Sequence, residues 1–308
     1  TPLTSSAASD VYKRQLLEGI REGEKVVSIL PLDRELIQNP EGHYIIFATS
    51  QGRIKRSHLS DYVKINRNGK YALKFAKDSD SLVQVRPATE EDHVVLVSSM
   101  GYACRFLPSE AKTRVDAATG ESVTTHTVRV QGRVSQGVAG MKLQSGDRVV
   151  GMIVTDDFDT SVLTISKHGM AKRSRLGSGS MVEIKLEDGT TAQGDDGAPL
   201  MERDGYRKTN RGTKGVRTMA LTDGDSIIGV RQIPDLSDQL FMLTDKGMMI
   251  RMPATQTKET LGKVTKGTRI MELRTKDKKS YADEIVFVAR LPSDLVERGD
   301  VESEGEEE

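Results

Sequence analysis

The chain has 308 residues, which is enough for one large domain or two ordinary ones, and it contains only 4% aromatic residues and no Trp. Its 45 basic and 45 acidic residues cancel, but Glu297 to Glu308 hold seven acids and one Arg, so this end carries −6 and the rest +6. A basic body favours a polyanionic partner. The single Cys104 excludes an internal disulfide and indicates a reducing, cytoplasmic compartment. No apolar run of about eighteen residues is present, which excludes a spanning helix and argues against a membrane partner.

Residues 1–15 are rich in Ser, Ala and Thr, show no periodicity, and are interpreted as a non-native or disordered leader. Residues 24–32 alternate as a first strand. A hairpin pattern then recurs four times: an apolar run with Ser or Thr, two variable residues, Gly, and a return segment that ends in a base. Its glycines are Gly52, Gly101, Gly169 and Gly247.

Each hairpin is followed by a second glycine with a basic neighbour and a further strand pattern, and then by a third strand that often begins with Gly-Asp. The second glycines are Gly69, Gly137, Gly215 and Gly267. One unit therefore holds about four strands, and no segment predicts an amphipathic helix. Four repeats of this kind predict an all-β propeller with four visible four-stranded blades.

The units are expected at about 24–88, 89–155, 156–233 and 234–292, within one array over 16–292, followed by an acidic disordered tail at 293–308. Insertions at 109–133 and 177–205 lengthen the two middle units, and Asp188-Gly189 inside the second insertion predicts a hairpin turn.

Basic residues recur at two points of every unit, the return strand of the hairpin and the surroundings of the second glycine. In a radial array these positions fall on one rim, where they would neutralise the phosphates of a bent duplex without reading its bases. Aromatic residues are not interleaved with the bases, which argues against stacking of single strands. The predicted DNA-binding residues are Arg53, Lys55, Arg56, Lys70, Lys74, Arg105, Arg133, Lys142, Lys172, Arg173, Arg175, Lys208, Arg211, Lys214, Arg217, Arg251, Lys263 and Lys266.

Two other interpretations of the chain stay open. Surface Lys and Arg also keep edge strands soluble, and a propeller with that surface could instead dock a protein on its face. We predict no catalytic residue and no metal site, because no phosphate loop, nucleophile elbow, dinucleotide fingerprint or metal-ligand spacing is present.

The repeats resemble the C-terminal domain of the A subunit of bacterial DNA gyrase. The stretches that carry the resemblance are Gln136–Leu143 with Gly146–Met152, and Asn210–Val216 with Gly224–Val230; the whole resemblance covers roughly 24–291, and the glutamate-rich end also fits. The resemblance implies a β-pinwheel, a disc whose blades exchange an outer strand and whose basic rim wraps duplex DNA.

The same resemblance implies partners and cofactors. Within a full-length protein the domain would serve a type II topoisomerase, a heterotetramer of two A and two B subunits in the bacterial nucleoid that uses ATP and Mg²⁺ to introduce negative supercoils. This chain would bind no cofactor itself and would be no enzyme on its own, because the region with the catalytic tyrosine is not in it. The first-blade motif Gln-Arg-Arg-Gly-Gly-Lys-Gly is also not in the sequence, so the related subunit of topoisomerase IV, with decatenation and substrate selection as its role, is the alternative.

Overall fold

The structure is a computed structural model that describes residues 26–64, 69–115, 120, 122–186, 188–260, 265–275 and 280–293. The predicted leader and all of the acidic tail except Ser293 lie outside these residues. The described chain contains mostly strands, and its short helical elements include α2 (Arg34–Gln38), α3 (Ser60–Val63) and η1 (Ala254–Gln256). Residues 26–32 form no strand, so the strand expected at 24–32 is wrong for its described part. No described helix is both long and apolar enough to cross a membrane.

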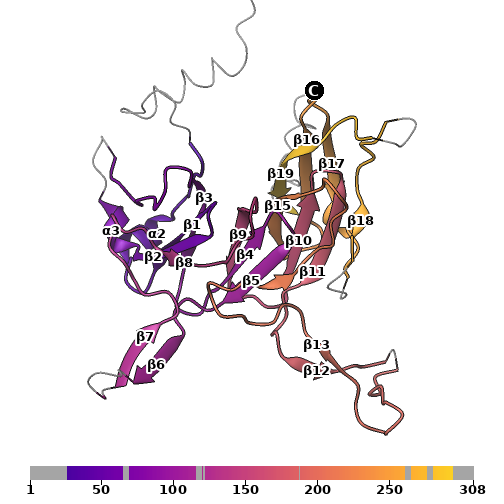
Figure 1. Cartoon of the computed structure of the whole chain (residues 1–308), viewed down its shortest axis with the longest axis horizontal. Helices are drawn as coiled ribbons and strands as arrows, with labels where there is room; N and C mark the ends of the chain where they lie inside the picture. Colours follow the sequence, from indigo (N-terminus) through magenta and orange to yellow (C-terminus); the bar gives the residue numbers. More distant parts are fainter. Residues whose placement is uncertain are drawn as a thin grey trace, which may run out of the picture.

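Four antiparallel sheets repeat one plan, as the sequence predicts. In each sheet a hairpin lies beside a longer strand from the same unit, and the sheets stand in an arc whose two ends are the first and last sheets (Figure 1). The hairpins are β1 (Tyr44–Thr49) with β2 (Arg53–His58), β4 (His93–Ser98) with β5 (Tyr102–Phe106), β10 (Ser161–Ser166) with β11 (Met170–Arg175), and β16 (Gln239–Thr244) with β17 (Met249–Pro253). The longer strands are β3 (Leu82–Ala88), β9 (Val149–Thr155), β15 (Ile227–Ile233) and β19 (Ile285–Leu291).

The outermost strand of three sheets comes from the following unit. The donated strands β8 (Val138–Ala139), β14 (Val216–Arg217) and β18 (Thr268–Arg269) pair with β2, β5 and β11, respectively. This confirms the strand exchange that the resemblance implies. The second-glycine segment of the first unit, residues 69–75, forms no strand, although its sequence predicts one.

The hairpin glycine makes the exchange possible. Gly52 has φ +78°, which favours glycine, and a Cβ there would lie 2.5 Å from the carbonyl oxygen of Met141 in the donated segment. Gly101 and Gly169 approach the carbonyls of Met219 and Met271 in the same way, at 2.5 and 2.3 Å. The recurrent glycine therefore serves both the turn and the close approach of the next unit's chain.

The aspartate that precedes each longer strand, often within a Gly-Asp motif, binds the hairpin turn of the same sheet. Asp147 accepts hydrogen bonds from the Ser99 hydroxyl at 2.8 Å and the Met100 amide at 3.0 Å. Asp80 accepts equivalent bonds from Ser50 and Gln51. The aspartate thus satisfies turn amides and ties the longer strand to its own hairpin.

The hydrophobic core lies between consecutive sheets. Ile46 and Ile54 of the first sheet pack with Leu96 of the second, and Val97 of the second packs with Val162 of the third. Because aliphatic side chains of neighbouring sheets interlock, each sheet depends on the next for its core.

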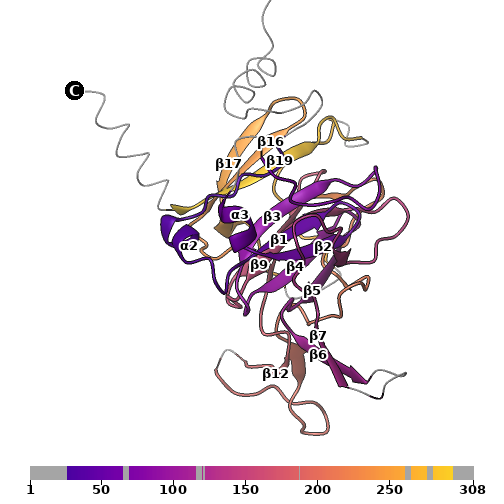
Figure 2. The ribbon, with the colours of Figure 1, turned by 90° about the vertical axis from the view of Figure 1, so that its left-hand side faces the viewer.

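Both insertions form projecting arms. One is the hairpin of β6 (Ala111–Val115) and β7 (Ser122–His126); the other pairs β12 (Met181–Glu183) with β13 (Met201–Arg203). The bridge between Lys185 and Thr191 confirms the predicted turn at Asp188-Gly189. Figures 1 and 2 show both arms extending from the same edge of the body.

Candidate nucleic-acid interface

Five of the predicted DNA-binding bases are buried. Their exposed fractions run from 0 to 8%, so the expectation that they lie on an open rim is wrong, and we assign them no phosphate contact. They are Lys55, Arg56, Arg105, Lys172 and Arg173.

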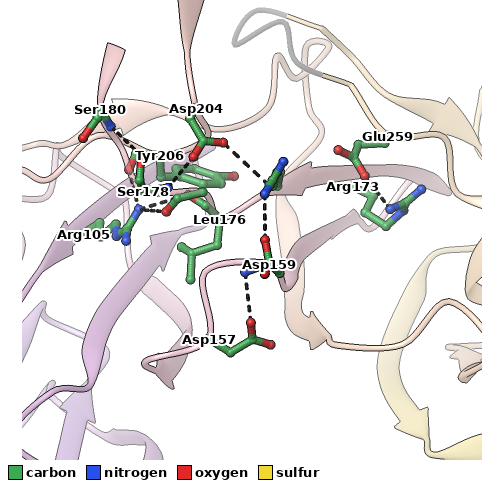
Figure 3. Close-up of polar contacts among 12 residues, drawn as sticks. Arg105, Asp157, Asp159, Arg173, Leu176, Ser178, Ser180, Asp204, Tyr206 and Glu259 are labelled. Atoms are coloured by element: carbon green, nitrogen blue, oxygen red, sulfur yellow. Dashed lines mark hydrogen bonds and ion pairs between the residues drawn. The ribbon is translucent and has the colours of Figure 1, made fainter. Parts of the chain in front are cut away.

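The buried arginines stand four residues after a hairpin glycine and hold chain segments of the next unit. Arg105 donates from Nη1 to the carbonyl oxygens of Leu176, Gly177 and Tyr206 at 3.0, 2.7 and 2.7 Å (Figure 3). Its Nε donates to Nδ1 of His93 at 3.3 Å. Burial lowers the pKa of Arg105 to about 10, although the carboxylate of Asp204 opposes the shift. Arg105 thus satisfies buried carbonyls of the third unit, which explains why a base occupies this position.

Arg173 and Arg56 act in a similar way. Arg173 donates to the carbonyl oxygen of Thr257 in the fourth unit at 3.2 Å. It also pairs with Glu259 of the same unit at 2.7 Å (Figure 3). Arg56 pairs with Glu90 at 2.7 Å and lies over the Tyr44 ring, 3.7 Å from its centroid. Each arginine therefore joins its sheet to the chain that follows.

The two buried lysines face the second-glycine segment of their own unit. Lys55 donates to the carbonyl oxygens of Ala72, at 2.6 Å, and of Arg133. Lys172 donates to the carbonyl oxygen of Thr218 at 2.7 Å. Burial lowers the pKa of each lysine to about 8, a shift that the charge of Asp61 partly opposes at Lys55. These lysines are structural groups whose charge is held at a cost to folding.

Four further predicted bases are partly or wholly exposed but packed or paired. Arg53 donates to the carbonyl oxygens of Gln136 and Gly137, and Arg211 donates to those of Thr127 and Ala139. Arg175 pairs with Asp159 at 2.7 Å, and the side chain of Arg133 is half-buried. These groups have less freedom to meet a phosphate than the remaining bases.

The remaining predicted bases within the described chain are exposed. They are Lys70, Lys74, Lys142, Lys208, Lys214, Arg217, Arg251 and Lys266; Lys263 lies outside the described residues. Most belong to the second-glycine segments, and the segments of the last three units supply the outermost strand of a sheet. Lys214 and Lys266 directly precede the second glycine, and Arg217 and the additional exposed Arg269 follow it by two residues. The exposed bases therefore repeat along the outer edge of the arc.

The structure adds one aromatic residue that sequence reasoning did not place there. Lys214 Nζ lies 4.1 Å from the centroid of the Tyr102 ring, and Arg217 donates to the Tyr102 hydroxyl at 2.8 Å. Hydrogen bonding to Lys214 lowers the pKa of this phenol, and the charges of both bases act in the same direction. Tyr102 is more than a hundred residues from its partners in sequence, so only the pairing of β5 with β14 reveals the cluster.

No group of three or more His, Cys, Asp or Glu side chains within the described residues could hold a metal ion. Cys104 is buried, and burial raises the pKa of its thiol, so it is held as a packed side chain beside Thr209 and Thr213. The chemistry available at the outer edge is thus cationic and hydrogen-bonding.

Comparison with known proteins identifies the repeat. A model of the DNA gyrase C-terminal domain, a β-propeller, matches residues 43–89, 122–156, 160–178, 201–234 and 238–291, more than half of the chain. The A subunits of DNA gyrase from Staphylococcus epidermidis and Staphylococcus aureus are 29% and 27% identical to the chain over 253 residues. This match covers 82% of the chain but only 23% of each relative, so the chain spans less than a quarter of their length.

Solved structures show the same fold. A crystal structure of the C-terminal domain of DNA topoisomerase IV matches with a TM-score of 0.67 and 17% identity, covering 96% of this chain and 75% of that one. A structure of the DNA gyrase A C-terminal domain matches with a TM-score of 0.63 and 19% identity, covering 91% and 74%. The family model, with the repeated sheets that it matches, makes this chain a member of the DNA gyrase C-terminal domain family.

Proposed function

We propose that the chain binds duplex DNA along the exposed bases of its outer edge and bends the duplex around the arc. The observation that carries this proposal is the repetition of exposed Lys and Arg on the donated segments, at Lys214 and Arg217 and again at Lys266 and Arg269. Equivalent positions on successive sheets lie along one curved path. Cations spaced along such a path suit the regularly spaced phosphates of a duplex.

The biological setting that we propose is a bacterial type II DNA topoisomerase in the cytoplasm, with this chain as part of its A subunits. The curated relatives named above are A subunits of DNA gyrase. In that setting the chain contributes DNA wrapping and no catalytic residue, while the rest of the A subunits, the B subunits, ATP and Mg²⁺ supply strand passage. A role in topoisomerase IV is the second candidate, because the matching solved structures include a domain from that enzyme.

A topological assay tests both candidates. The chain is bound to nicked circular DNA, the nick is ligated, the protein is removed, and the linking number is compared with that of a protein-free control. If the chain wraps DNA, the linking number is expected to shift, and the shift is expected to disappear in the Lys214→Ala/Arg217→Ala variant. Binding without a shift would favour a topoisomerase IV-like role. A folded chain that binds no DNA at moderate salt would overturn the DNA proposal in favour of a protein-docking propeller.

A further inference from the structure

The longer strands of the four sheets line one cavity on the concave side of the arc. These strands are β3, β9, β15 and β19, and in the first three sheets they form the edge opposite the donated strand (Figure 1). The cavity has a volume of about 850 Å³, and its walls include the aliphatic side chains of Val83, Val150 and Val230. It is therefore separate from the outer edge, where the exposed bases of the donated segments lie.

Three arginines from three different sheets line this cavity. They are Arg86 of β3, Arg231 of β15 and Arg290 of β19. Arg86 and Arg231 occupy equivalent positions, because Arg86 lies opposite Ile46 and Arg231 opposite Leu163, each six residues before a hairpin glycine. None of the described residues that line the cavity is an Asp or a Glu. The cavity wall is thus both aliphatic and cationic.

Only one of the three arginines has a described acidic partner. Arg290 pairs with Asp238 at 2.9 Å. Arg231 donates to the carbonyl oxygens of Val230, at 2.7 Å, and of Val288, and these acceptors carry no net charge. The exposed Arg86 makes no hydrogen bond or ion pair with any residue that the structure describes. Two guanidinium charges therefore face the cavity without a counter-charge.

The arginines are close enough to repel each other. Partial burial, and after it the charge of Arg290, lower the pKa of Arg86. Burial, and after it the charge of Arg86, lower the pKa of Arg231. Like charges held together in a partly desolvated cavity destabilise the fold, and a bound anion would relieve this repulsion.

We propose that this cavity binds a small anion that carries a phosphate group. A guanidinium group presents N–H pairs that match phosphate oxygens, and one phosphate has enough oxygens to accept from several arginines. Arg86 is the main ligand, because its donors have no described acceptor, and Arg231 supplies the second uncompensated charge. The aliphatic wall suits the carbon skeleton of an organic phosphate. This site lies on the opposite side of each sheet from the edge proposed to bind DNA, so the two proposals stand independently.

The test is calorimetric titration with pyrophosphate at constant ionic strength. The wild type is expected to bind pyrophosphate, and Arg86→Gln is expected to bind it about tenfold or more weakly, because it loses charge-assisted hydrogen bonds. Lys214→Ala/Arg217→Ala is the matched control: it removes two charges from the outer edge and is expected to bind pyrophosphate like the wild type. A wild type that binds no pyrophosphate, or a loss of equal size in both variants, would overturn the proposal. Equal binding of citrate would overturn the choice of phosphate over carboxylate.

Thermal unfolding gives a second readout that a failed fold cannot imitate. Without the anion, Arg86→Gln is expected to be at least as stable as the wild type, because one of the repelling charges is gone. Pyrophosphate is expected to raise the Tm of the wild type by binding the folded state, to raise that of Arg86→Lys less, and to leave that of Arg86→Gln unchanged. An equal rise in all three proteins would place the anion elsewhere and overturn the proposal.

Discussion

Arg105 and Arg251 occupy the same position of the repeat, four residues after a hairpin glycine, yet Arg105 is 1% exposed and Arg251 is exposed. The difference lies in what covers them. Chain segments from the third unit enclose Arg105, and three of their carbonyl oxygens accept its hydrogen bonds. Arg251 stands on β17, which has no described strand on its outer side. One sequence position therefore serves two physical roles.

This difference predicts opposite effects of one substitution. Arg105→Ala removes three buried hydrogen bonds and leaves the carbonyls of Gly177 and Tyr206 without a described donor, so it should lower the free energy of unfolding by about 3 kcal/mol or more. Arg251→Ala removes an exposed side chain and should change it by less than about 0.5 kcal/mol. Urea denaturation of both variants measures this difference. Equal effects would contradict the assignment of Arg105 as a structural clamp.

The depressed pKa of Lys172 predicts a stability that rises with pH. Burial lowers this pKa from 10.5 to about 8, so between these values the unfolded chain binds a proton that the folded protein does not. From pH 7.5 to 10, the stability of the wild type relative to Lys172→Met should rise by about 2 kcal/mol. Denaturant titrations of both proteins at the two pH values measure this change in their stability difference. A pH-independent difference between the two proteins would show that Lys172 keeps its ordinary pKa.

His93 predicts a loss of stability in acid. Burial, together with the nearby charges of Arg105 and Lys208, lowers the pKa of His93 from 6.5 to about 4. As the pH falls through this window only the unfolded state gains the proton, so from pH 7.5 to 5 the wild type should lose about 2 kcal/mol through this residue. His93→Gln should lack this component, whereas the exposed His58→Gln should keep it. If the wild type and both variants lost the same amount of stability between pH 7.5 and 5, a group other than His93 would be responsible.

The exposed bases predict the salt dependence of DNA binding. Lys214→Ala/Arg217→Ala should lower the slope of log affinity against log salt by about 2, because each lost phosphate contact contributes about 0.9. Its effect should be the same for DNA of unrelated sequence. Fluorescence anisotropy at several salt concentrations provides the measurement. The matched control is Lys112→Ala/Lys185→Ala, which removes two charges from the projecting arms; a slope that falls equally in both variants would contradict an interface on the donated strands.

The sequence alone determined the repeated plan of the fold. Gly at a turn that needs positive φ, alternating β-branched residues and the Gly-Asp motif are local signals, and they predict strands, turns and the number of units before any contact is known. The projecting hairpin at Asp188-Gly189 followed from the same local chemistry. Residues 69–75 show the limit of such signals, because their strand pattern yields no strand where no described partner strand lies beside them.

Only the tertiary structure decided which bases are free to meet DNA. Arg53 to Arg56 hold three bases in four residues, which suggests an exposed strand. Lys55 is nevertheless buried against Ala72 of its own unit and Arg133 of the next, and Arg56 is buried and paired with Glu90 of the next unit. The acceptors of Arg105 lie 71 to 101 residues further along the chain, so no local pattern indicates that they will enclose it. Burial is a property of what packs over a side chain, and here a neighbouring unit supplies that cover. The sequence therefore located the bases, while the exchange of strands between units divided them into buried clamps and an exposed edge.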